Sequence, residues 1–340
     1  MRIRITALTS ALVALTLPLA GCMSSPPEAA PAQPDTLWQQ AREVTRGDPW
    51  LVGVGDSFIS GEGGRWASNG TSNAQIPENG GWMLGTSDQA YGDAANGTET
   101  IPYCHRSATA TSFVGDGWNV KNLACSGAMT TSFVNTYGRA KPGIDFASTQ
   151  TPGGLKFVGQ AQLLQDFAKD HDVKAVALSI GGNDLGFADI IATCLTDWIV
   201  DTKCSNSDFI AARINPAVKK IIAPITTVDM KDALVGHRLC EKGTTRPDAG
   251  TGIPPNGFAQ NTEWVRFISV LAAEGYAESS EAQEAVHPTY FGQRTLSSCM
   301  RAALALPPAT EGAFCTRDEV LSFNEDSQPK VTVTAAKLPY

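Results

Sequence analysis

The chain has 340 residues, of which 42% are hydrophobic and 18% are charged, and this composition is ordinary for a folded globular protein. Its formal net charge of −8 argues against a nucleic-acid partner, which would require a basic face. The length fits one large α/β domain or two smaller ones, and the sequence has neither an internal repeat nor a clear second domain boundary.

The N-terminus has the pattern of an export signal. A short basic start is followed by mostly apolar residues 5–17, a stretch too short to span a membrane confidently. Residues 19–22, Leu-Ala-Gly-Cys, resemble the lipobox of bacterial lipoproteins, in which the cysteine becomes the lipid-modified first residue. We therefore expect a signal peptide over residues 1–21 and an outward-facing protein anchored in the cell membrane through Cys22. The alternative is a plain secretory signal, cut after Ala20, and a secreted protein.

A tether and one folded domain are expected after the signal. Residues 22–36 are rich in Ser, Pro and Ala, as in a disordered linker. The domain is predicted over residues 37–320, beginning with a short helix at residues 37–46. Residues 321–340 are predicted to be a weakly structured tail.

The cysteines fit an exported protein that contains disulfides. Cys104 and Cys125 flank one segment, and Cys194 and Cys204 lie close together in sequence, so each pair is a disulfide candidate. One further pair is expected among the last three cysteines, Cys240, Cys299 and Cys315. No Cys-x-x-Cys or His-x-x-x-His spacing is present, and we predict no metal site.

The main candidate for chemistry is residues 55–63, Gly-Asp-Ser-Phe-Ile-Ser-Gly-Glu-Gly. This stretch follows apolar residues 50–54, which are predicted to form a strand. A Gly-rich turn at the end of a strand can present the Ser57 hydroxyl at the carboxyl edge of a sheet, where active sites of open α/β folds lie. An ordinary βα turn would use the same small residues. Ser57 is therefore a nucleophile only if a base and an oxyanion hole lie elsewhere in the chain.

Residues 61–118 are predicted to form a long loop with one short helix near residues 108–114. Because the loop directly follows Ser57, we expect it to wall the site. It carries aromatic residues that either line an acyl or sugar pocket or pack within the loop, namely Trp66, Trp82, Tyr91, Tyr103 and Trp118.

Further elements predict a mostly parallel sheet. Residues 120–124 and 173–180 are apolar runs predicted to be strands, and residues 155–170 between them have the apolar spacing of a helix. A strand–helix–strand order with Gly-rich ends favours an α/β fold. Weaker patterns follow, namely a helix from residue 187, a helix at 210–222, a strand at 225–228 and an amphipathic helix around 296–304.

Four histidines are candidates for the base. Pro288 restricts the backbone of His287 to extended geometry and so fixes the direction of its imidazole, which favours this residue. His237 and His105 are the alternatives. His171 follows a predicted helix, where a contact with the helix end is the simpler role.

Two turns after strands offer donors for an oxyanion hole. Gly127 follows the strand at 120–124 and can offer a backbone N–H, and Asn183 follows the strand at 173–180 and can offer its side-chain amide. Both would lie at the same sheet edge as Ser57. The simpler explanation is that Gly and Asn suit left-handed turns.

Together these stretches resemble the SGNH (GDSL-type) hydrolase family, and most of all its secreted actinobacterial lipases and esterases. The four blocks of the family occur in order, as Gly-Asp-Ser at 55–57, a Gly after the second strand, Gly-Gly-Asn-Asp at 181–184 and His-Pro at 287–288. Residues 124–128, Ala-Cys-Ser-Gly-Ala, and 236–240, Gly-His-Arg-Leu-Cys, are also similar. The resemblance runs from about residue 50 to about residue 305 and implies a three-layer α/β/α, flavodoxin-like fold around a mostly parallel sheet.

The resemblance also implies roles for individual residues. Ser57 would be the nucleophile and His287 the general base, and the oxyanion hole would combine the N–H groups of Ser57 and Gly127 with the Asn183 side chain. The substrate would be a carboxylic ester of a lipid, an acylated polysaccharide or a small molecule. We expect no cofactor and a monomer.

Two departures from the family pattern matter. The family often has an aspartate three residues before the histidine, where this chain has Glu284. Either Glu284 orients His287 as the acid of a triad, or a nearby backbone carbonyl does so. The segment 185–286 is also shorter than the corresponding segment of relatives, which indicates that one βα unit is missing or reduced. The alternative function is therefore a catalytically inactive surface lipoprotein that uses the fold as a binding module, although the complete Ser/Gly/Asn/His set favours the enzyme.

Overall fold

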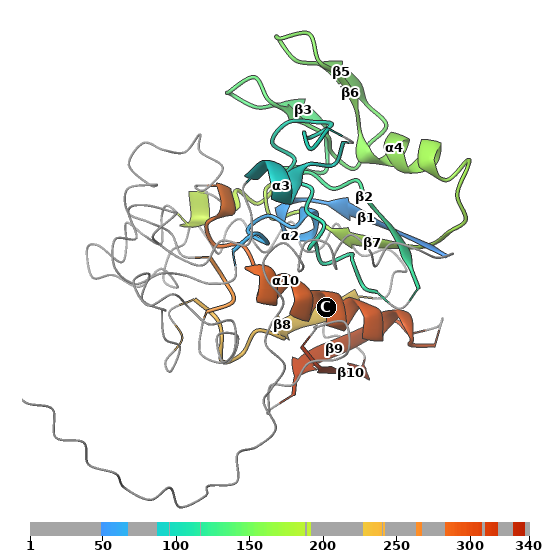
Figure 1. The fold of residues 1–340 in the computed structure, drawn as a ribbon, viewed down its shortest axis with the longest axis vertical. Coiled ribbons are helices and arrows are strands. Elements are labelled where there is room, and N and C mark those ends of the chain that lie inside the picture. The colour runs from blue at the N-terminus through green and yellow to red at the C-terminus, as the bar shows by residue number, and fades with distance from the viewer. Residues whose placement is uncertain are drawn as a thin grey trace, which may run out of the picture. The chain divides into compact units, whose positions relative to one another are not determined.

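Figure 1 shows the fold in a computed structural model. The described residues are 49–66, 87–94, 96–115, 117–187, 189–191, 227–239, 241, 263–266, 283–307, 310–318 and 329–336. Met1–Ala30 and Pro31–Tyr340 form separate units, and all described residues belong to the second. Several predictions lie outside the described residues, namely the signal and tether, Cys22, the helices at 37–46 and 210–222, Trp82, Cys194, Cys204 and Cys240.

A three-stranded parallel sheet has the strand order β2-β1-β7. Its strands are β1 (Trp50–Gly55), β2 (Asn119–Asn122) and β7 (Val173–Ser179), and each overlaps a predicted strand. The predicted parallel sheet is confirmed to this extent.

Both faces of β1 are buried. Neighbouring side chains of a strand point in opposite directions, and the two sets pack into different hydrophobic clusters. Leu51 belongs to a cluster packed by α10 (Tyr290–Leu304). Val52 and Val54 belong to another cluster, which is packed by α4 (Gln160–Phe167). Figure 1 accordingly shows the two helices on opposite sides of the sheet.

A second three-stranded sheet has the order β10-β9-β8. It consists of β8 (Thr227–Asp232), β9 (Gly312–Arg317) and β10 (Val331–Ala335), with β8 and β9 parallel and β9 and β10 antiparallel. A disulfide between Cys299 and Cys315 joins α10 to β9.

The described strands therefore form separate small sheets, where one central sheet was expected. Besides the two three-stranded sheets there are two hairpins, formed by β3 (Phe133–Val134) with β4 (Ala140–Lys141) and by β5 (Ser148–Gln150) with β6 (Lys156–Val158). The structure supports a mixed α/β fold with a small parallel sheet.

Several local predictions need correction. Residues 156–158, expected to begin a helix, pair with β5 as a strand, and α4 starts only after Gly159. Residues 108–114 form turns, where a short helix was expected. β10 lies within the tail that was expected to be weakly structured, because alternate valines Val331 and Val333 pack against the second sheet's core.

Candidate active site

Ser57 is the first residue of α2 (Ser57–Ser60), directly after β1. The Asp56 carboxylate caps this helix by accepting the Phe58 N–H at 3.2 Å. Gly55 has φ +135°, and a Cβ there would lie 1.8 Å from the Ser179 carbonyl oxygen. The Gly-Asp-Ser sequence thus combines a close approach of β1 to β7, a helix cap and a serine at the helix start.

The structure brings His287 to Ser57. The His287 Nε2 atom lies 2.7 Å from the Ser57 Oγ, and both side chains are buried. The His287 Nδ1 atom lies 2.8 Å from the carbonyl oxygen of Ala285. Because a carbonyl only accepts hydrogen bonds, Nδ1 carries the proton, and Nε2 is free to take the Ser57 proton.

The backbone around His287 is held in a defined turn. The Val286 N–H donates to the Arg266 carbonyl and the Arg266 N–H donates to the His287 carbonyl, each at 2.8 Å. Val286 has φ +59°, a left-handed geometry that is rare for a β-branched residue. This turn directs the Ala285 carbonyl at the His287 ring.

Glu284 takes a different place from the triad acid considered above. Its fully buried carboxylate accepts hydrogen bonds from Arg65 Nε and Trp66 Nε1 at 2.6 Å each and from the Tyr91 hydroxyl at 2.5 Å. The ring nitrogen Nδ1 of His287 is bonded to the Ala285 carbonyl. Of the two arrangements, the structure therefore forms the one with a backbone carbonyl, and Glu284 ties the His287 turn to the loop after α2.

The loops that carry the predicted oxyanion donors are joined. The Asn183 Nδ2 donates to the Ala128 carbonyl at 2.8 Å, which leaves its second N–H. Asp184 accepts the Thr130 N–H at 3.0 Å. Because these loops follow β2 and β7, Gly127 and Asn183 lie at the carboxyl edge of the parallel sheet, as Ser57 does after β1.

Two N–H groups at this edge remain available. Gly127 has φ +75°, which its lack of a side chain permits. Within the described parts of the chain, the N–H groups of Ser57 and Gly127 have no hydrogen-bond acceptor. They are therefore free to bind an oxyanion.

All four histidines are described, and the other three have their own contacts. His171 stacks on Phe167 with ring centroids 3.9 Å apart and bonds the Phe167 carbonyl, which matches its expected place at a helix end. His237 stacks on Trp264 with ring centroids 3.8 Å apart. The His105 Nδ1 lies 2.7 Å from a carboxylate oxygen of Glu62. His287 is thus the histidine that contacts Ser57.

Glu62 and His105 form a buried ion pair next to the site. Burial alone would raise the pKa of Glu62, but the charge and hydrogen bond of His105 hold it below its ordinary value. Burial alone would lower the pKa of His105, but the charge and hydrogen bond of Glu62 raise it. The pair lies in the loop that follows Ser57, and sequence reasoning left Glu62 without a role.

The His287 imidazole is neutral at neutral pH. Its burial lowers its pKa below the ordinary 6.5, and the negative charge of Glu62 opposes this shift. A neutral imidazole is the form that can accept the Ser57 proton.

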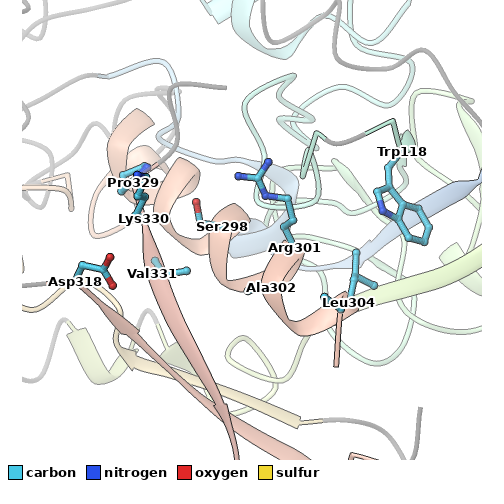
Figure 2. Close-up of a pocket in the computed structure, with 10 residues that line it drawn as sticks. Trp118, Ser298, Arg301, Ala302, Leu304, Asp318, Pro329, Lys330 and Val331 are labelled. Atoms are coloured by element: carbon cyan, nitrogen blue, oxygen red, sulfur yellow. The ribbon is translucent and has the colours of Figure 1, made fainter. Parts of the chain in front are cut away.

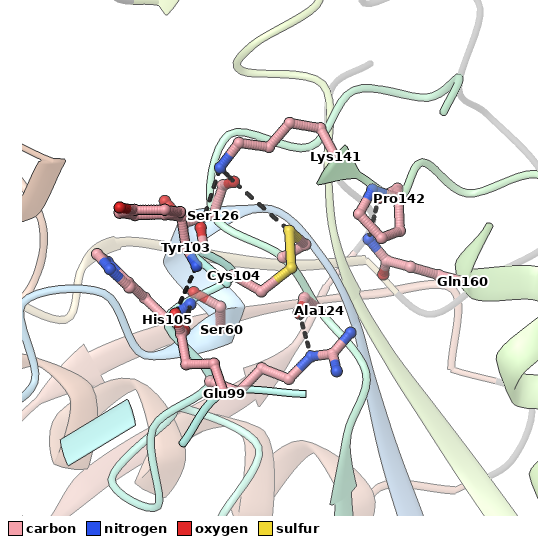
Figure 3. Close-up of a disulfide and its surroundings, with 12 residues drawn as sticks. Ser60, Glu99, Tyr103, Cys104, His105, Ala124, Ser126, Lys141, Pro142 and Gln160 are labelled. Carbon is pink, nitrogen blue, oxygen red and sulfur yellow. Dashed lines mark hydrogen bonds between the residues drawn. A yellow bond between two sulfur atoms is a disulfide. The ribbon is translucent and has the colours of Figure 1, made fainter. Parts of the chain in front are cut away.

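Two polar residues that sequence reasoning did not single out support the loops of the site. Gln160 accepts the Gly55 N–H at 2.6 Å and donates to the carbonyls of Gly55 and Pro142 at 2.8 Å each. Lys141 donates to the Ser126 carbonyl at 2.6 Å, beside the Cys104–Cys125 disulfide (Figure 3). Isolated polar residues outside any motif carry no signal for such roles.

The aromatic residues of the 61–118 loop mostly pack rather than line a pocket. Trp66 and Tyr91 are buried and bond Glu284, and the Arg139 guanidinium lies over the Tyr103 ring. Trp118 borders a cleft of about 480 Å³ between α10 and β10, which also contains Arg301 (Figure 2). This cleft includes none of the predicted site residues.

The disulfides indicate an exported or extracellular protein. The predicted Cys104–Cys125 bridge is formed, and the expected pair among the last three cysteines is Cys299–Cys315. None of the helices in the described part of the chain could cross a membrane, and no cluster of described residues could hold a metal ion.

Searches of family models, curated proteins and solved structures found no match to the chain.

Proposed function

We propose that this protein is an exported serine ester hydrolase of the SGNH type, with a three-layer α/β/α fold, that cleaves carboxylic esters through an acyl-enzyme on Ser57. The observation that carries the proposal is the 2.7 Å contact between Ser57 Oγ and His287 Nε2. The bond from Nδ1 to the Ala285 carbonyl supports it, since it leaves Nε2 ready to act as a base.

Ester cleavage at this site takes two acyl transfers. The Ser57 Oγ attacks the ester carbonyl carbon as its proton moves to His287 Nε2, and the carbonyl oxygen becomes an oxyanion bound by the donors at Ser57, Gly127 and Asn183. Collapse expels the alcohol, which takes the proton from His287. A water molecule then attacks the acyl-enzyme while His287 takes its proton, and collapse releases the acid and restores the Ser57 hydroxyl.

The ester group is the part of the substrate that these residues specify. The acyl chain and the alcohol would be chosen by the walls of the site, and a series of p-nitrophenyl esters of increasing chain length compares them directly. The N-terminal pattern and the disulfides support action outside the cytoplasm, with the protein tethered through Cys22 or secreted.

The Ser57→Ala variant tests the proposal. Removing the nucleophile is expected to lower kcat on a short-chain p-nitrophenyl ester by about 10³-fold or more, because only oxyanion stabilisation and binding would remain. A fluorophosphonate probe should label Ser57 in the wild-type protein and leave the variant unlabelled. The matched control is Ser148→Ala, a change on the exposed strand β5 that should leave the rate unchanged. An unchanged rate in Ser57→Ala would rule out an acyl-enzyme on Ser57, and a wild-type protein without hydrolysis would favour the alternative of a non-catalytic binding protein.

A further inference from the structure

Lys141 is a buried cation next to the predicted oxyanion hole. It ends β4 and is only 3% exposed. Its ammonium donates to the Ser126 carbonyl at 2.6 Å and to the Tyr103 carbonyl at 3.0 Å. Figure 3 shows the side chain reaching past the Cys104–Cys125 disulfide toward Ser126. A buried charge is costly unless it is compensated, so its position requires an explanation beyond packing.

The carbonyl that Lys141 binds belongs to the same peptide group as the Gly127 N–H. In a trans peptide the C=O and the N–H point in opposite directions. A cation on the Ser126 oxygen therefore fixes the direction of the Gly127 N–H and polarises it, because hydrogen bonds in a chain strengthen one another. The lysine also packs across Gly127, where an added Cβ would lie 3.4 Å from Nζ.

Lys141 forms no contact ion pair with a described carboxylate. Among the described residues, none of the carboxylates forms a salt bridge with it, and its hydrogen bonds go to two backbone carbonyls. The charged groups that act on it are Glu62 and Glu99, which attract it, and Arg139, which repels it. The cation is thus positioned to respond to negative charge that develops beyond the Ser126–Gly127 peptide.

We propose that Lys141 is a positioning residue of the oxyanion hole, whose ammonium orients and polarises the Ser126–Gly127 peptide so that the Gly127 N–H stabilises the oxyanion formed on the substrate. This inference rests on the proposed ester hydrolase function. The role belongs to the transition state, since the carbonyl oxygen carries a full negative charge only there. It should therefore affect kcat and leave KM nearly unchanged.

The pH dependence of the wild-type enzyme tests the inference without any substitution. Burial lowers the pKa of Lys141 from 10.5 to about 8, and the attraction of Glu62 and Glu99 opposes this while Arg139 adds to it. Lys141 therefore carries its positive charge at pH 7 and loses its proton, and with it the charge, above pH 8. We expect kcat to rise with pH through the depressed pKa of His287 and to fall again near pH 8. A kcat that stays flat from about pH 7 to about 11, beyond even the ordinary lysine pKa of 10.5, would overturn the proposal.

Lys141→Arg separates this lysine from other titrating groups. A guanidinium stays charged throughout this range, so the alkaline fall should disappear. Burial also raises the pKa of Asp56 to about 7, and this residue adjoins Ser57. If Lys141 and not Asp56 causes the alkaline fall in kcat, the Asp56→Asn variant should still show this fall near pH 8. Loss of the fall in Asp56→Asn, or its persistence in Lys141→Arg, contradicts the assignment.

Lys141→Gln and Lys141→Met remove the charge. Each should lower kcat at pH 7 by about tenfold, less than the 10²–10³ typical of deleting a direct oxyanion donor, with KM within about twofold. Affinity for a trifluoromethyl ketone, whose adduct with Ser57 carries an oxyanion, should fall by the same factor as kcat/KM. The matched control is Lys156→Met on β6, an exposed position where neither value should change.

The outcomes separate the inference from the function on which it rests. If wild-type hydrolysis is absent or survives Ser57→Ala, the ester hydrolase function fails and the role of Lys141 falls with it. If hydrolysis depends on Ser57 but folded Lys141→Gln keeps the wild-type kcat and ketone affinity, only the role of Lys141 is wrong. Should both neutral variants fail to fold, the wild-type and Lys141→Arg pH profiles still decide.

Discussion

The Glu284 carboxylate supports the candidate site without contacting the His287 ring. Its three hydrogen bonds go to Arg65, Trp66 and Tyr91, which come from the loop after α2 and from α3 (Ser87–Tyr91). The Glu284 carbonyl also accepts the His287 N–H at 3.3 Å. The residue thus links the segment that follows Ser57 to the segment that carries His287.

We predict that Glu284→Gln damages stability more than catalysis. The change removes the negative charge that the buried Arg65 contacts at 2.6 Å, which should cost about 3 kcal/mol of unfolding free energy. The His287 tautomer is set by the Ala285 carbonyl, so kcat should fall by less than about tenfold, against about 10⁴ for a lost triad acid. Thermal unfolding and steady-state kinetics measure the two effects. Glu311→Gln, at an exposed position, is the control, and a stable Glu284→Gln with a 10⁴-fold lower kcat would restore the triad role.

The acidic residue that caps α2 is about half protonated at neutral pH. Asp56 caps the helix, but burial raises its pKa from 3.8 to about 7, and the backbone hydrogen bond of Phe58 only partly offsets this. A raised pKa favours the folded state below pH 3.8 and withdraws that stability as the pH rises toward 7. The contribution of Asp56 to stability is thus smallest in alkaline solution.

Asp56→Asn is therefore expected to stabilise the protein at high pH. Asparagine keeps the acceptor for the Phe58 N–H and carries no charge to bury. The melting temperature should match the wild type near pH 4 and exceed it at pH 8, by about 2–4 °C for each kcal/mol gained. Calorimetry at the two pH values checks this. A variant that melts lower at pH 8 would mean that the charged carboxylate is the better cap.

The elements that sequence patterns predicted well are those whose burial shows in the sequence itself. β1 and β7 are apolar runs, and α10 has an apolar stripe at helical spacing. β9 and β10 escaped prediction because they have shorter apolar runs than β1, and β8, the parallel partner of β9, lies far earlier in the chain. The pairing of strands into separate small sheets depends on such distant contacts, which periodicity does not report.

Some residues of the candidate site could likewise be predicted from the sequence, and others could not. Ser57, Gly127, Asn183 and His287 sit in motifs at the ends of elements, and the structure brings their loops to one region. Lys141 and Gln160 gave no pattern, because their roles depend on the backbone carbonyls they meet after folding. The choice between Glu284 and a carbonyl could not be made from spacing, since both lie within three residues of His287.

Across the whole molecule the two described disulfides support different parts, which predicts different effects of removing them. Cys104–Cys125 lies next to the carbonyls of Tyr103 and Ser126 that bind Lys141, whereas Cys299–Cys315 joins α10 to the second sheet. Replacing either pair by alanines should lower stability by about 2–5 kcal/mol. Of the two double variants, only the one that combines Cys104→Ala with Cys125→Ala should also lower kcat.

Denaturant unfolding and kinetics on the two double variants compare these effects, and each variant serves as the control for the other. Activity should be assayed at a temperature where both remain folded. Equal losses of kcat in the two variants would show that the first disulfide has no special relation to the site.

The hydrogen bond between Ser57 and His287 joins residues 230 positions apart in the chain. Closing so long a loop costs conformational entropy that many contacts along the chain must offset, so we expect this bond to form late in folding. A nascent or partly folded chain would therefore carry the serine without its base. Reactivity at Ser57 would then appear only after the fold is complete, and a precursor crossing a membrane in an unfolded state would be harmless to the esters it passes.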